Sequence, residues 1–419
     1  MVAIARLGEG TRERPLAALL IGSLALCADS WDAFLLVYAL SDISETFHLG
    51  LGVTALALMG TYSTRWLGGM VFGSLANRFG RKKALMISVL WFSVFTMLTG
   101  AATSFAMLLV IRVLFGLGMG GAYAAGGSLV TESAGNRYRG FSSGVYMSGF
   151  YIGQMMAPIA YSFISPVAGW RGLFLFGGIS LLLIPAIALW VVESPVWLAA
   201  KRSGSIAAHS AFSVWRLFLP GLLGITLALI AIEFGEFFIA YPFTALMPAF
   251  LKAERNFAVA TIAFAGSGLA FGALIGSLVG SWLSDLFGRK PVFAAAYVAG
   301  TLPTLVAMYA PSTNVIVAAS ALAGVVIGVL GGLVTAFENE HYPTEIRSAG
   351  NGFVHNLGAF GGSIGAVIAA FLRGAVGFQL AILSILMMGV ILGITGLVFT
   401  RETAGVSLLD IDAQRGRRG

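Results

Sequence analysis

The sequence has few charged residues and almost no cysteine. Charged residues make up 10% of the 419 residues, against roughly a quarter in a typical soluble domain, which excludes an ordinary soluble domain. The single cysteine, Cys27, excludes an intrachain disulfide. The sequence also lacks a metal-ligand cluster, a nucleophile elbow and a phosphate-binding loop, since its glycine run at 116–121 lies inside an apolar segment. We therefore expect no enzyme, no cofactor and no metal site.

Hydrophobic residues, in contrast, make up 58% of the chain. A membrane-spanning helix needs about 20 mostly apolar residues, and the sequence predicts an all-α membrane protein with twelve transmembrane helices in two six-helix bundles. The spans are expected at 16–40, 52–76, 84–102, 106–131, 141–164, 170–192, 217–243, 256–280, 291–310, 313–337, 351–372 and 376–400. The predicted domains are an N-terminal bundle (1–192), a linker (193–216), a C-terminal bundle (217–400) and a tail (401–419).

The two halves are related by an internal duplication. The motif Phe-Gly-Arg-Lys begins at Phe79 and recurs at Phe287, a shift of 208 positions, in two basic, glycine-rich links between apolar segments. The same shift relates a second set of residues, in which Glu132, Arg139 and Gly144 correspond to Glu340, Arg347 and Gly352. Because two separate landmarks share one shift, we interpret the chain as a duplicated one.

The positive charges predict the topology. The net charge is +7, and 19 of the 25 Lys and Arg residues fall on the even-numbered connections and the two ends, with four on the odd-numbered connections and two inside spans. This asymmetry follows the positive-inside rule, so both termini and both glycine-rich links are expected in the cytoplasm. The first helix is expected to be retained, since no cleavage site follows it. We predict a multi-pass inner-membrane protein that contacts lipid, does not bind nucleic acid and works as a monomer.

Acidic residues inside the spans are the first candidates for a functional site. Asp29 and Asp32 lie near the middle of span one on one helix face. Glu233 and Glu236 have the same spacing in span seven, its repeat counterpart. Intramembrane acids usually face a cavity and often carry protons, so we predict proton coupling by these four residues. The structural alternative is that one acid of each pair neutralises Arg65 or Arg112, or is capped by backbone and water.

Arg65 lies midway along span two and requires a counter-ion. A guanidinium binds a carboxylate through two parallel hydrogen bonds, so a carboxylated substrate is one candidate partner and Asp29 or Asp32 the other. Further residues predicted to reach a substrate cavity are Arg112, Tyr62, Tyr123, Tyr151, Gln154, His355 and Asn356.

The sequence resembles the major facilitator superfamily. The resemblance covers nearly the whole chain and rests on the first glycine-rich link, on Arg112 with its following glycines, and on two segments that begin at Glu193 and Tyr342. Asp29-Ser-Trp-Asp32, Arg65 and Gly169-Trp170-Arg171 resemble the metabolite:proton, sialate:proton and aromatic-acid:proton symporter branches. The resemblance implies two bundles, a central substrate site, alternating access and a cytoplasmic gate in which Arg78 and Arg81 pair with acids such as Glu132. The expected gate residues are Gly73, Asn77, Arg78, Gly80, Arg81, Glu132, Arg139, Asp285, Gly288, Arg289, Glu340 and Arg347.

Two positions depart from the family pattern. Asn77 stands where the signature usually has Asp, which Asp285 retains in the second copy, and Ala122 stands where the metabolite and sialate branches often have an acid. The second departure moves the expected proton path to Asp29, Asp32, Glu233 and Glu236.

The leading prediction is a proton-coupled symporter of a small organic anion such as a monocarboxylate, an aromatic acid or a sugar acid. An efflux antiporter or organic-cation carrier is the alternative, because four intramembrane acids outnumber two arginines. A sugar carrier is a third transport reading, from Glu193-Ser194-Pro195 and Glu402-Thr403-Ala404-Gly405. A nutrient receptor without transport is the reading from another class, and it would normally have a longer soluble extension.

Overall fold

The computed structural model describes residues 15–204, 210–241, 244, 247, 250–251, 255–257, 259–310 and 312–408. Within these residues the regular structure is entirely helical. The sequence-based expectations for the first 14 residues, for 205–209 and for the tail beyond 408 lie outside the described residues.

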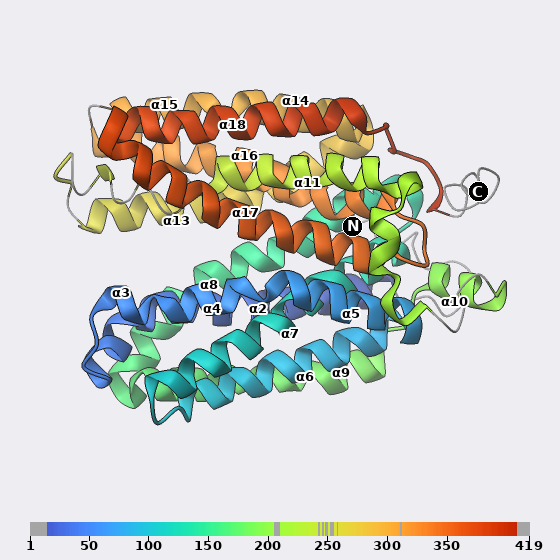
Figure 1. The fold of residues 1–419 in the computed structure, drawn as a ribbon, viewed down its shortest axis with the longest axis horizontal. Helices are drawn as coiled ribbons and strands as arrows, with labels where there is room; N and C mark the ends of the chain where they lie inside the picture. The colour runs from blue at the N-terminus through green and yellow to red at the C-terminus, as the bar shows by residue number, and fades with distance from the viewer. Residues whose placement is uncertain are drawn as a thin grey trace.

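The N-terminal half (Figure 1, blue to green) contains the first six spans. Its elements are α2 (Pro15–Thr46), α3 (Leu51–Thr54), α4 (Leu56–Ser63), α5 (Arg65–Phe79), α6 (Arg81–Gly100), α7 (Phe105–Ser133), η2 (Asn136–Tyr138), α8 (Arg139–Gly177), η3 (Gly178–Leu182) and α9 (Leu183–Trp190). Span two consists of α3, α4 and α5, spans five and six share α8, and η3 and α9 complete span six.

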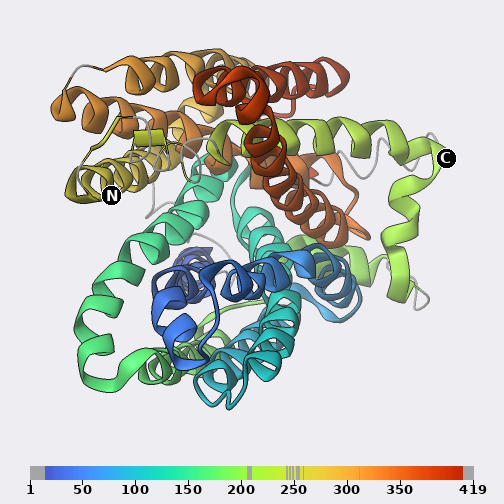
Figure 2. The ribbon, with the colours of Figure 1, turned by 60° about the vertical axis from the view of Figure 1, so that its left-hand side comes forward.

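The C-terminal half (Figure 1, yellow-green to red) contains the other six spans. Its elements are η4 (Ser210–Phe218), α11 (Pro220–Tyr241), α13 (Val259–Phe287), α14 (Arg289–Ala299), α15 (Thr301–Tyr309), α16 (Thr313–His341), α17 (Arg347–Val376) and α18 (Phe378–Phe399). Between the halves, α10 (Pro195–Arg202) and η4 form helical turns where the sequence predicted only a polar linker. Figure 2 shows these two segments on the outside of the halves, and η4 packs against α5 and α17.

The membrane character agrees with the sequence prediction. Nine helical stretches within the described residues are long and apolar enough to cross a membrane, and one of them covers both spans five and six. Gly169 separates those two arms with a φ of 63°, a left-handed conformation that glycine adopts without strain. It lies in the connection predicted between spans five and six.

Span two is broken at Thr64, next to Arg65. Its hydroxyl donates a hydrogen bond of 2.6 Å to the backbone carbonyl of Val113 in α7. The break separates α4 from α5, so that Arg65 is the first residue of a new helix.

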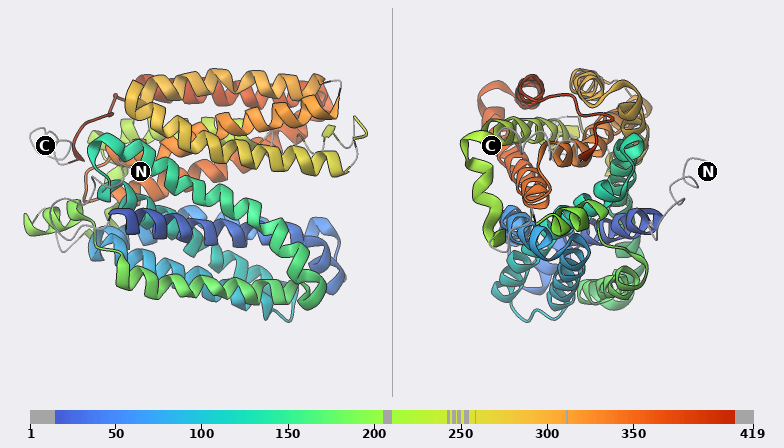
Figure 3. Two further views of the ribbon diagram at one scale, coloured as in Figure 1. Left: turned by 180° about the vertical axis from the view of Figure 1, so that it is seen from behind. Right: turned by 90° about the vertical axis from the view of Figure 1, so that its right-hand side faces the viewer.

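The two halves touch through small residues. A Cβ atom built on Gly73 of α5 would lie 2.6 Å from the Cα of Ala349 in α17, and one on Gly144 of α8 would lie 2.1 Å from the carbonyl oxygen of Ser277 in α13. These two helix contacts between the halves are equivalent by the duplication. The 208-position shift relates Gly144 of α8 to Gly352 of α17, and Gly69 of α5 to Ser277 of α13. Such close contact needs residues without large side chains. Figure 3 shows the two halves packed side by side along their length and from one end.

Candidate substrate cavity and ion-pair gate

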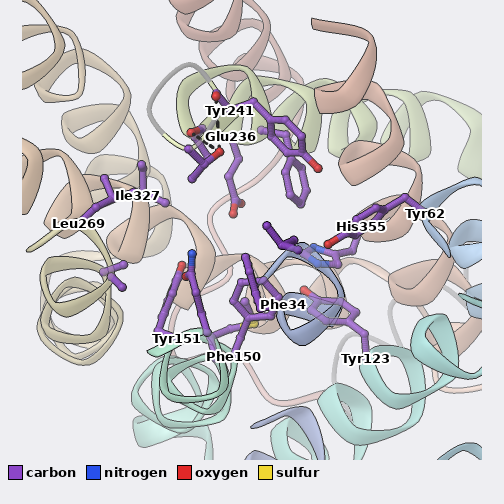
Figure 4. A pocket seen from close by; sticks show the side chains of 18 of the residues that line it. Phe34, Tyr62, Tyr123, Phe150, Tyr151, Glu236, Tyr241, Leu269, Ile327 and His355 are labelled. Atoms are coloured by element: carbon purple, nitrogen blue, oxygen red, sulfur yellow. Dashed lines mark hydrogen bonds between the residues drawn. The ribbon is translucent and has the colours of Figure 1, made fainter. Parts of the chain in front are cut away.

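A cavity of about 330 Å³ lies between the two halves (Figure 4). Aromatic side chains from both halves make up much of its wall, together with the guanidinium of Arg65 and the carboxylate of Glu236. The lining residues are Phe34, Val37, Leu58, Tyr62, Arg65, Tyr123, Met147, Phe150, Tyr151, Gln154, Glu236, Phe237, Ala240, Tyr241, Thr244, Leu269, Ala270, Ala273, Ile327 and His355.

The structure brings seven of the sequence-predicted residues to this cavity: Tyr62, Arg65, Tyr123, Tyr151, Gln154, Glu236 and His355. Five others are buried near it without lining it: Asp29, Asp32, Arg112, Glu233 and Asn356. Asn356 donates a hydrogen bond of 2.6 Å to the carbonyl of Gly352, where α17 packs against α5. Apolar aromatic lining residues such as Phe34, Phe150 and Phe237 were not predicted, because in sequence they look like any lipid-facing ring.

Arg112 is neutralised by Asp32. Both terminal guanidinium nitrogens donate to the Oδ2 atom of Asp32 at 2.9 Å, and the Nε donates to Thr61 at 3.3 Å. The guanidinium also lies 4.1 Å from the ring centre of Phe115, a cation–π contact. Arg112 thus has a complete set of partners within the N-terminal half.

Arg65 has no such partner. It is buried, it faces the cavity, and no carboxylate among the described residues forms an ion pair with it. Its Nε lacks a hydrogen-bond acceptor among those residues. Asp29 is the acid that acts electrostatically with Arg65, and neither carboxylate oxygen of Asp29 accepts a hydrogen bond within the described part of the chain. A cation and an acid therefore lie near each other, each with unused hydrogen-bonding capacity.

The acids of the C-terminal half gather around one histidine. The Nδ1 of His355 lies 3.0 Å from Glu233 Oε1, and the imidazole stacks on the ring of Tyr123 with 3.6 Å between the ring centres. The Tyr123 hydroxyl lies 2.9 Å from the hydroxyl of Thr335. A third acid, Glu338, joins Glu233 and Glu236 in this cluster.

Glu338 was missed by the sequence analysis. The predicted span ended at 337, whereas α16 continues to His341 and keeps Glu338 fully buried. An extension of the hydropathy window by one helical turn would have included it.

An ion-pair gate closes the end of the molecule where the two glycine-rich links lie, which we name the basic end (right-hand side of Figure 1). In the first copy, the Nε and NH2 atoms of Arg81 donate to Glu132 at 3.0 and 2.9 Å, and the Ser194 hydroxyl also donates to Glu132. In the second copy, Arg289 donates to Glu340 at 3.3 and 3.1 Å, and the Thr403 hydroxyl donates to Glu340 at 2.6 Å.

Two further ion pairs cross from one half to the other. Arg347 of the C-terminal half lies 3.0 Å from Glu132, and Arg139 of the N-terminal half lies 3.1 Å from Glu340. All four side chains are essentially fully buried. The crossing arginines are related by the same 208-position shift, so the gate repeats the duplication of the chain.

Asn77, which stands where the family signature usually has Asp, makes fewer contacts in the gate than its repeat counterpart Asp285. Asp285 accepts hydrogen bonds from the backbone N–H groups of Gly140 and Phe141 at 3.0 and 2.8 Å, and pairs with Arg289 at 2.6 Å. Asn77, its repeat counterpart, accepts one bond of 3.2 Å from the N–H of Ser348. The first copy thus keeps the contact between halves without the charge.

Arg78 does not join the gate. It lies exposed on the outer face of α5, with its guanidinium 5.0 Å from the ring centre of Phe79. The helix turn that points Arg78 outward leaves Arg81, on the next helix, to reach Glu132. The glycines Gly80 and Gly288 adopt φ angles of 105° and 99° at these turns, where a side chain would be strained.

Glu402 holds the second glycine-rich turn in place. It accepts the backbone N–H of Arg289 at 2.9 Å and that of Lys290 at 3.0 Å, and those of Thr403 and Ala404 at 2.9 Å. Burial alone would raise the pKa of this carboxyl, but the four N–H donors outweigh it and hold the pKa below its ordinary value. Glu193 accepts the N–H groups of Arg81 and Lys82 in the same way.

Comparison with known proteins identifies the family. The sequence profile of the Major Facilitator Superfamily matches residues 22–250 and 229–416, nearly the whole chain. This chain belongs to the Major Facilitator Superfamily. The resemblance inferred from the motifs is confirmed. The protein is a membrane transporter rather than an enzyme.

Relatives and solved structures of this superfamily agree in length and fold. The sialic acid transporter NanX of Escherichia coli K12 is 28% identical over 87% of this chain and 89% of its own. The 4-hydroxybenzoate transporter PcaK of Acinetobacter baylyi is 26% identical over 81% of this chain and 83% of its own. The structure of the proton:xylose symporter XylE matches with a TM-score of 0.78 and 17% identity, over 96% of this chain and 98% of XylE. The match confirms the predicted fold of twelve helices in two bundles.

Proposed function

We propose that this chain is a proton-coupled symporter that carries a small organic anion by alternating access. The observation that carries the proposal is the position of Arg65 in the cavity wall without a carboxylate partner. A buried guanidinium without a counter-ion is strongly unfavourable, and a carboxylated substrate would supply two charge-assisted hydrogen bonds. Arg112 does not serve this purpose, since Asp32 already occupies it.

Proton coupling is proposed at Asp29. Asp29 lies close enough to Arg65 to interact with it electrostatically without forming an ion pair. When the substrate carboxylate binds Arg65, two acids compete for one cation, and a proton on Asp29 removes the excess charge. Binding of the anion and binding of a proton therefore favour each other.

The direction of access is proposed from the gate. Ion pairs join the halves at the basic end, whereas the cavity wall extends toward Val37 and Thr244, which are both exposed near the opposite end. We place the basic end, with both termini, in the cytoplasm, in line with the positive-inside rule. The described conformation then faces outward, and the protein functions as a monomer in the lipid bilayer.

The named substrates of relatives support an anion. Proteins similar to this chain are named as transporters of sialic acid, 4-hydroxybenzoate and gallate, and another as a cis,cis-muconate transport protein. All four compounds carry a carboxyl group, the group that Arg65 is placed to bind. The aromatic lining of the cavity further suits a ring or another planar substrate.

One observation favours the alternative of an organic cation. Glu236 also lines the cavity, and its Oε2 has no hydrogen-bond partner in the described part of the chain. A cationic substrate, exchanged for protons, would pair with Glu236 while Arg65 stayed a structural neighbour of Asp29.

Uptake by the purified protein in liposomes tests these proposals. Labelled 4-hydroxybenzoate, sialic acid, lactate and a hexose would be compared with and without an inward proton gradient. We expect gradient-driven accumulation of at least one acid, and none of the hexose. Proton exchange of an organic cation, with no acid accumulated, would overturn the anion proposal in favour of the alternative.

A further inference from the structure

The proposed cycle of Arg65 and Asp29 leaves one buried acid without a role. Glu338 of α16 is fully buried beside Glu233, Glu236 and Tyr123. Its carboxylate lies beside those acids and the Tyr123 hydroxyl, and it forms no ion pair with a basic side chain among the residues that the structure describes. A buried carboxylate without a cation is strongly unfavourable, and uptake of a proton removes most of that cost. A residue of this kind is retained in a membrane protein chiefly for function.

The duplication indicates that the fold does not need an acid at this position. The 208-position shift relates Glu338 to Val130, and Val130 packs in an apolar cluster with Leu26, Tyr146 and Met147. The equivalent place in the N-terminal half is thus filled by a simple aliphatic side chain. An acid at this position is therefore present in the C-terminal half alone.

The arginines of the N-terminal spans are not repeated at the equivalent positions of the C-terminal half. The repeat counterparts of Arg65 and Arg112 are Ala273 and Ser320. Asp32 pairs with Arg112, whereas Glu236, which corresponds to Asp32 at a shift of 204 positions, pairs with no cation among the described residues. The charge balance of the N-terminal half is therefore absent from the C-terminal half.

Four titratable groups surround Glu338. From α11 they are Glu233 and Glu236, from α7 Tyr123, and through Glu233 the imidazole of His355 on α17. Three carboxylates thus lie together, one of them in contact with a histidine, and the mutual repulsion of ionised neighbours favours a shared proton.

The cluster reaches toward both sides of the membrane. Glu236 and His355 line the cavity, which gives protons a way in from the outward-facing side. Glu338 lies two residues before the gate acid Glu340 on the same helix, about 3 Å further from the basic end along the axis. Separation of the halves at the gate would open the neighbourhood of Glu338 to water on the other side.

We propose that Glu338, with Glu233 and Glu236, forms a second proton site that is loaded through the cavity and unloaded at the opened gate. The proposal rests on the proposed symport. One proton travels on Asp29 opposite the substrate carboxylate, and one travels on the acid cluster independently of Arg65. A monocarboxylate thus enters with two protons, and each cycle moves one net positive charge inward.

The test is the dependence of uptake on membrane potential. Liposomes carry wild-type protein, Glu338→Gln, or the matched control Glu45→Gln at an exposed site, with no pH gradient and a potassium diffusion potential set by valinomycin. The substrate is 4-hydroxybenzoate or sialic acid, whichever the uptake screen shows to be carried, since each is a monoanion at pH 7. With one net charge, the accumulation ratio rises about tenfold per 59 mV of inside-negative potential.

For the wild type and Glu45→Gln we expect the accumulation ratio to rise about tenfold per 59 mV of membrane potential. For Glu338→Gln we expect the ratio not to depend on the potential, although this variant still accumulates substrate when a pH gradient is applied. Glu338→Asp, which keeps an acid, is expected to restore the slope. A wild-type slope of zero, or an unchanged slope in Glu338→Gln, would overturn the second proton site. If Glu338→Gln does not fold, the potential dependence of the wild type tests the proposal alone, because a slope of zero means that no second proton is carried. Failure of the symport proposal looks different, because the wild type would then accumulate no acid even with a pH gradient.

Discussion

Arg112 and Asp32 form a buried pair in which both terminal guanidinium nitrogens donate to a single carboxylate oxygen at 2.9 Å. This pair uses up one of the two intramembrane arginines and one of the two acids of α2. What remains is Arg65 at the cavity and Asp29 beside it. In the proposed function, the fixed pair has a structural role and the open pair carries the substrate and the proton.

Replacement of Arg65 by lysine tests the proposed anchor for the substrate carboxylate. Lysine keeps the charge but loses the planar fork. Loss of one charge-assisted hydrogen bond, about 1.5–3 kcal/mol, predicts a rise in KM of roughly tenfold to a hundredfold, with normal protein abundance. The measurement is concentration-dependent uptake in liposomes. Arg137→Lys, at an exposed site, serves as the control, and equal uptake by both variants would refute the anchor role.

Replacement of Asp29 by asparagine tests the proton linked to the substrate. The amide cannot release a proton, so we expect exchange of labelled for unlabelled substrate to continue while accumulation against a gradient is lost. Paired counterflow and proton-driven uptake assays would measure this. Asp32→Asn should behave differently, because it leaves Arg112 buried without a counter-ion at a cost of about 3–5 kcal/mol, and its thermal stability should fall. Accumulation at the wild-type level by Asp29→Asn would exclude coupling at this residue.

Replacement of Gly73 by alanine tests closure at the basic end. The added Cβ would lie 2.6 Å from the Cα of Ala349, so the halves can no longer meet and the open form is favoured. In a background with Cys27→Ala, a cysteine at the buried Asn351 should react several-fold faster with a maleimide in Gly73→Ala than without it.

Gly374→Ala is the matched control for Gly73→Ala, since an added Cβ at Gly374 has no atom within 4 Å in the described residues. It should leave the labelling rate unchanged. The same labelling rate for both glycine variants would argue against steric contact between α5 and α17 as part of the closed state.

Glu402 predicts a pH-dependent contribution to stability. Because its pKa is below the ordinary value in the folded protein, its ionised form stabilises the second glycine-rich turn above the ordinary pKa, and this contribution disappears as pH falls through the lowered folded pKa. Glu402→Gln should therefore lower the Tm of the detergent-solubilised protein at pH 7, by an amount that shrinks in acid. Glu45→Gln is the control, and a Tm difference that is the same at all pH values would contradict the assignment.

The sequence alone was sufficient for the features that depend on composition and repetition. Twelve spans follow from hydropathy, and the correspondence of Glu132 with Glu340 follows from the 208-position shift. Four of the intramembrane acids stand out because charge is rare in apolar segments. Glu338 escaped for a physical reason, since α16 carries its acidic end beyond the apolar stretch of the sequence and keeps it buried within the protein.

The sequence could not predict which acid pairs with which arginine. Nothing in the order of residues decides whether Asp32 faces Arg65 or Arg112, because that depends on how α2 is rotated against α5 and α7. The exposed position of Arg78 likewise depends on the helix turn at Gly80 rather than on the motif in which it occurs. The aromatic wall of the cavity appears only when helices from both halves are brought together.

The two gate acids have a consequence for the speed of transport. Each accepts one arginine from its own half and one from the other, since Arg81 and Arg347 share Glu132 while Arg289 and Arg139 share Glu340. When the halves separate, Arg347 and Arg139 leave, but neither carboxylate is left without a cation. Separation therefore avoids the full penalty of an orphaned buried charge, and the departing arginines move into water as they lose their partners. The gate can hold the halves together firmly and still open within a single turnover, because closing adds a second partner to acids that are never alone.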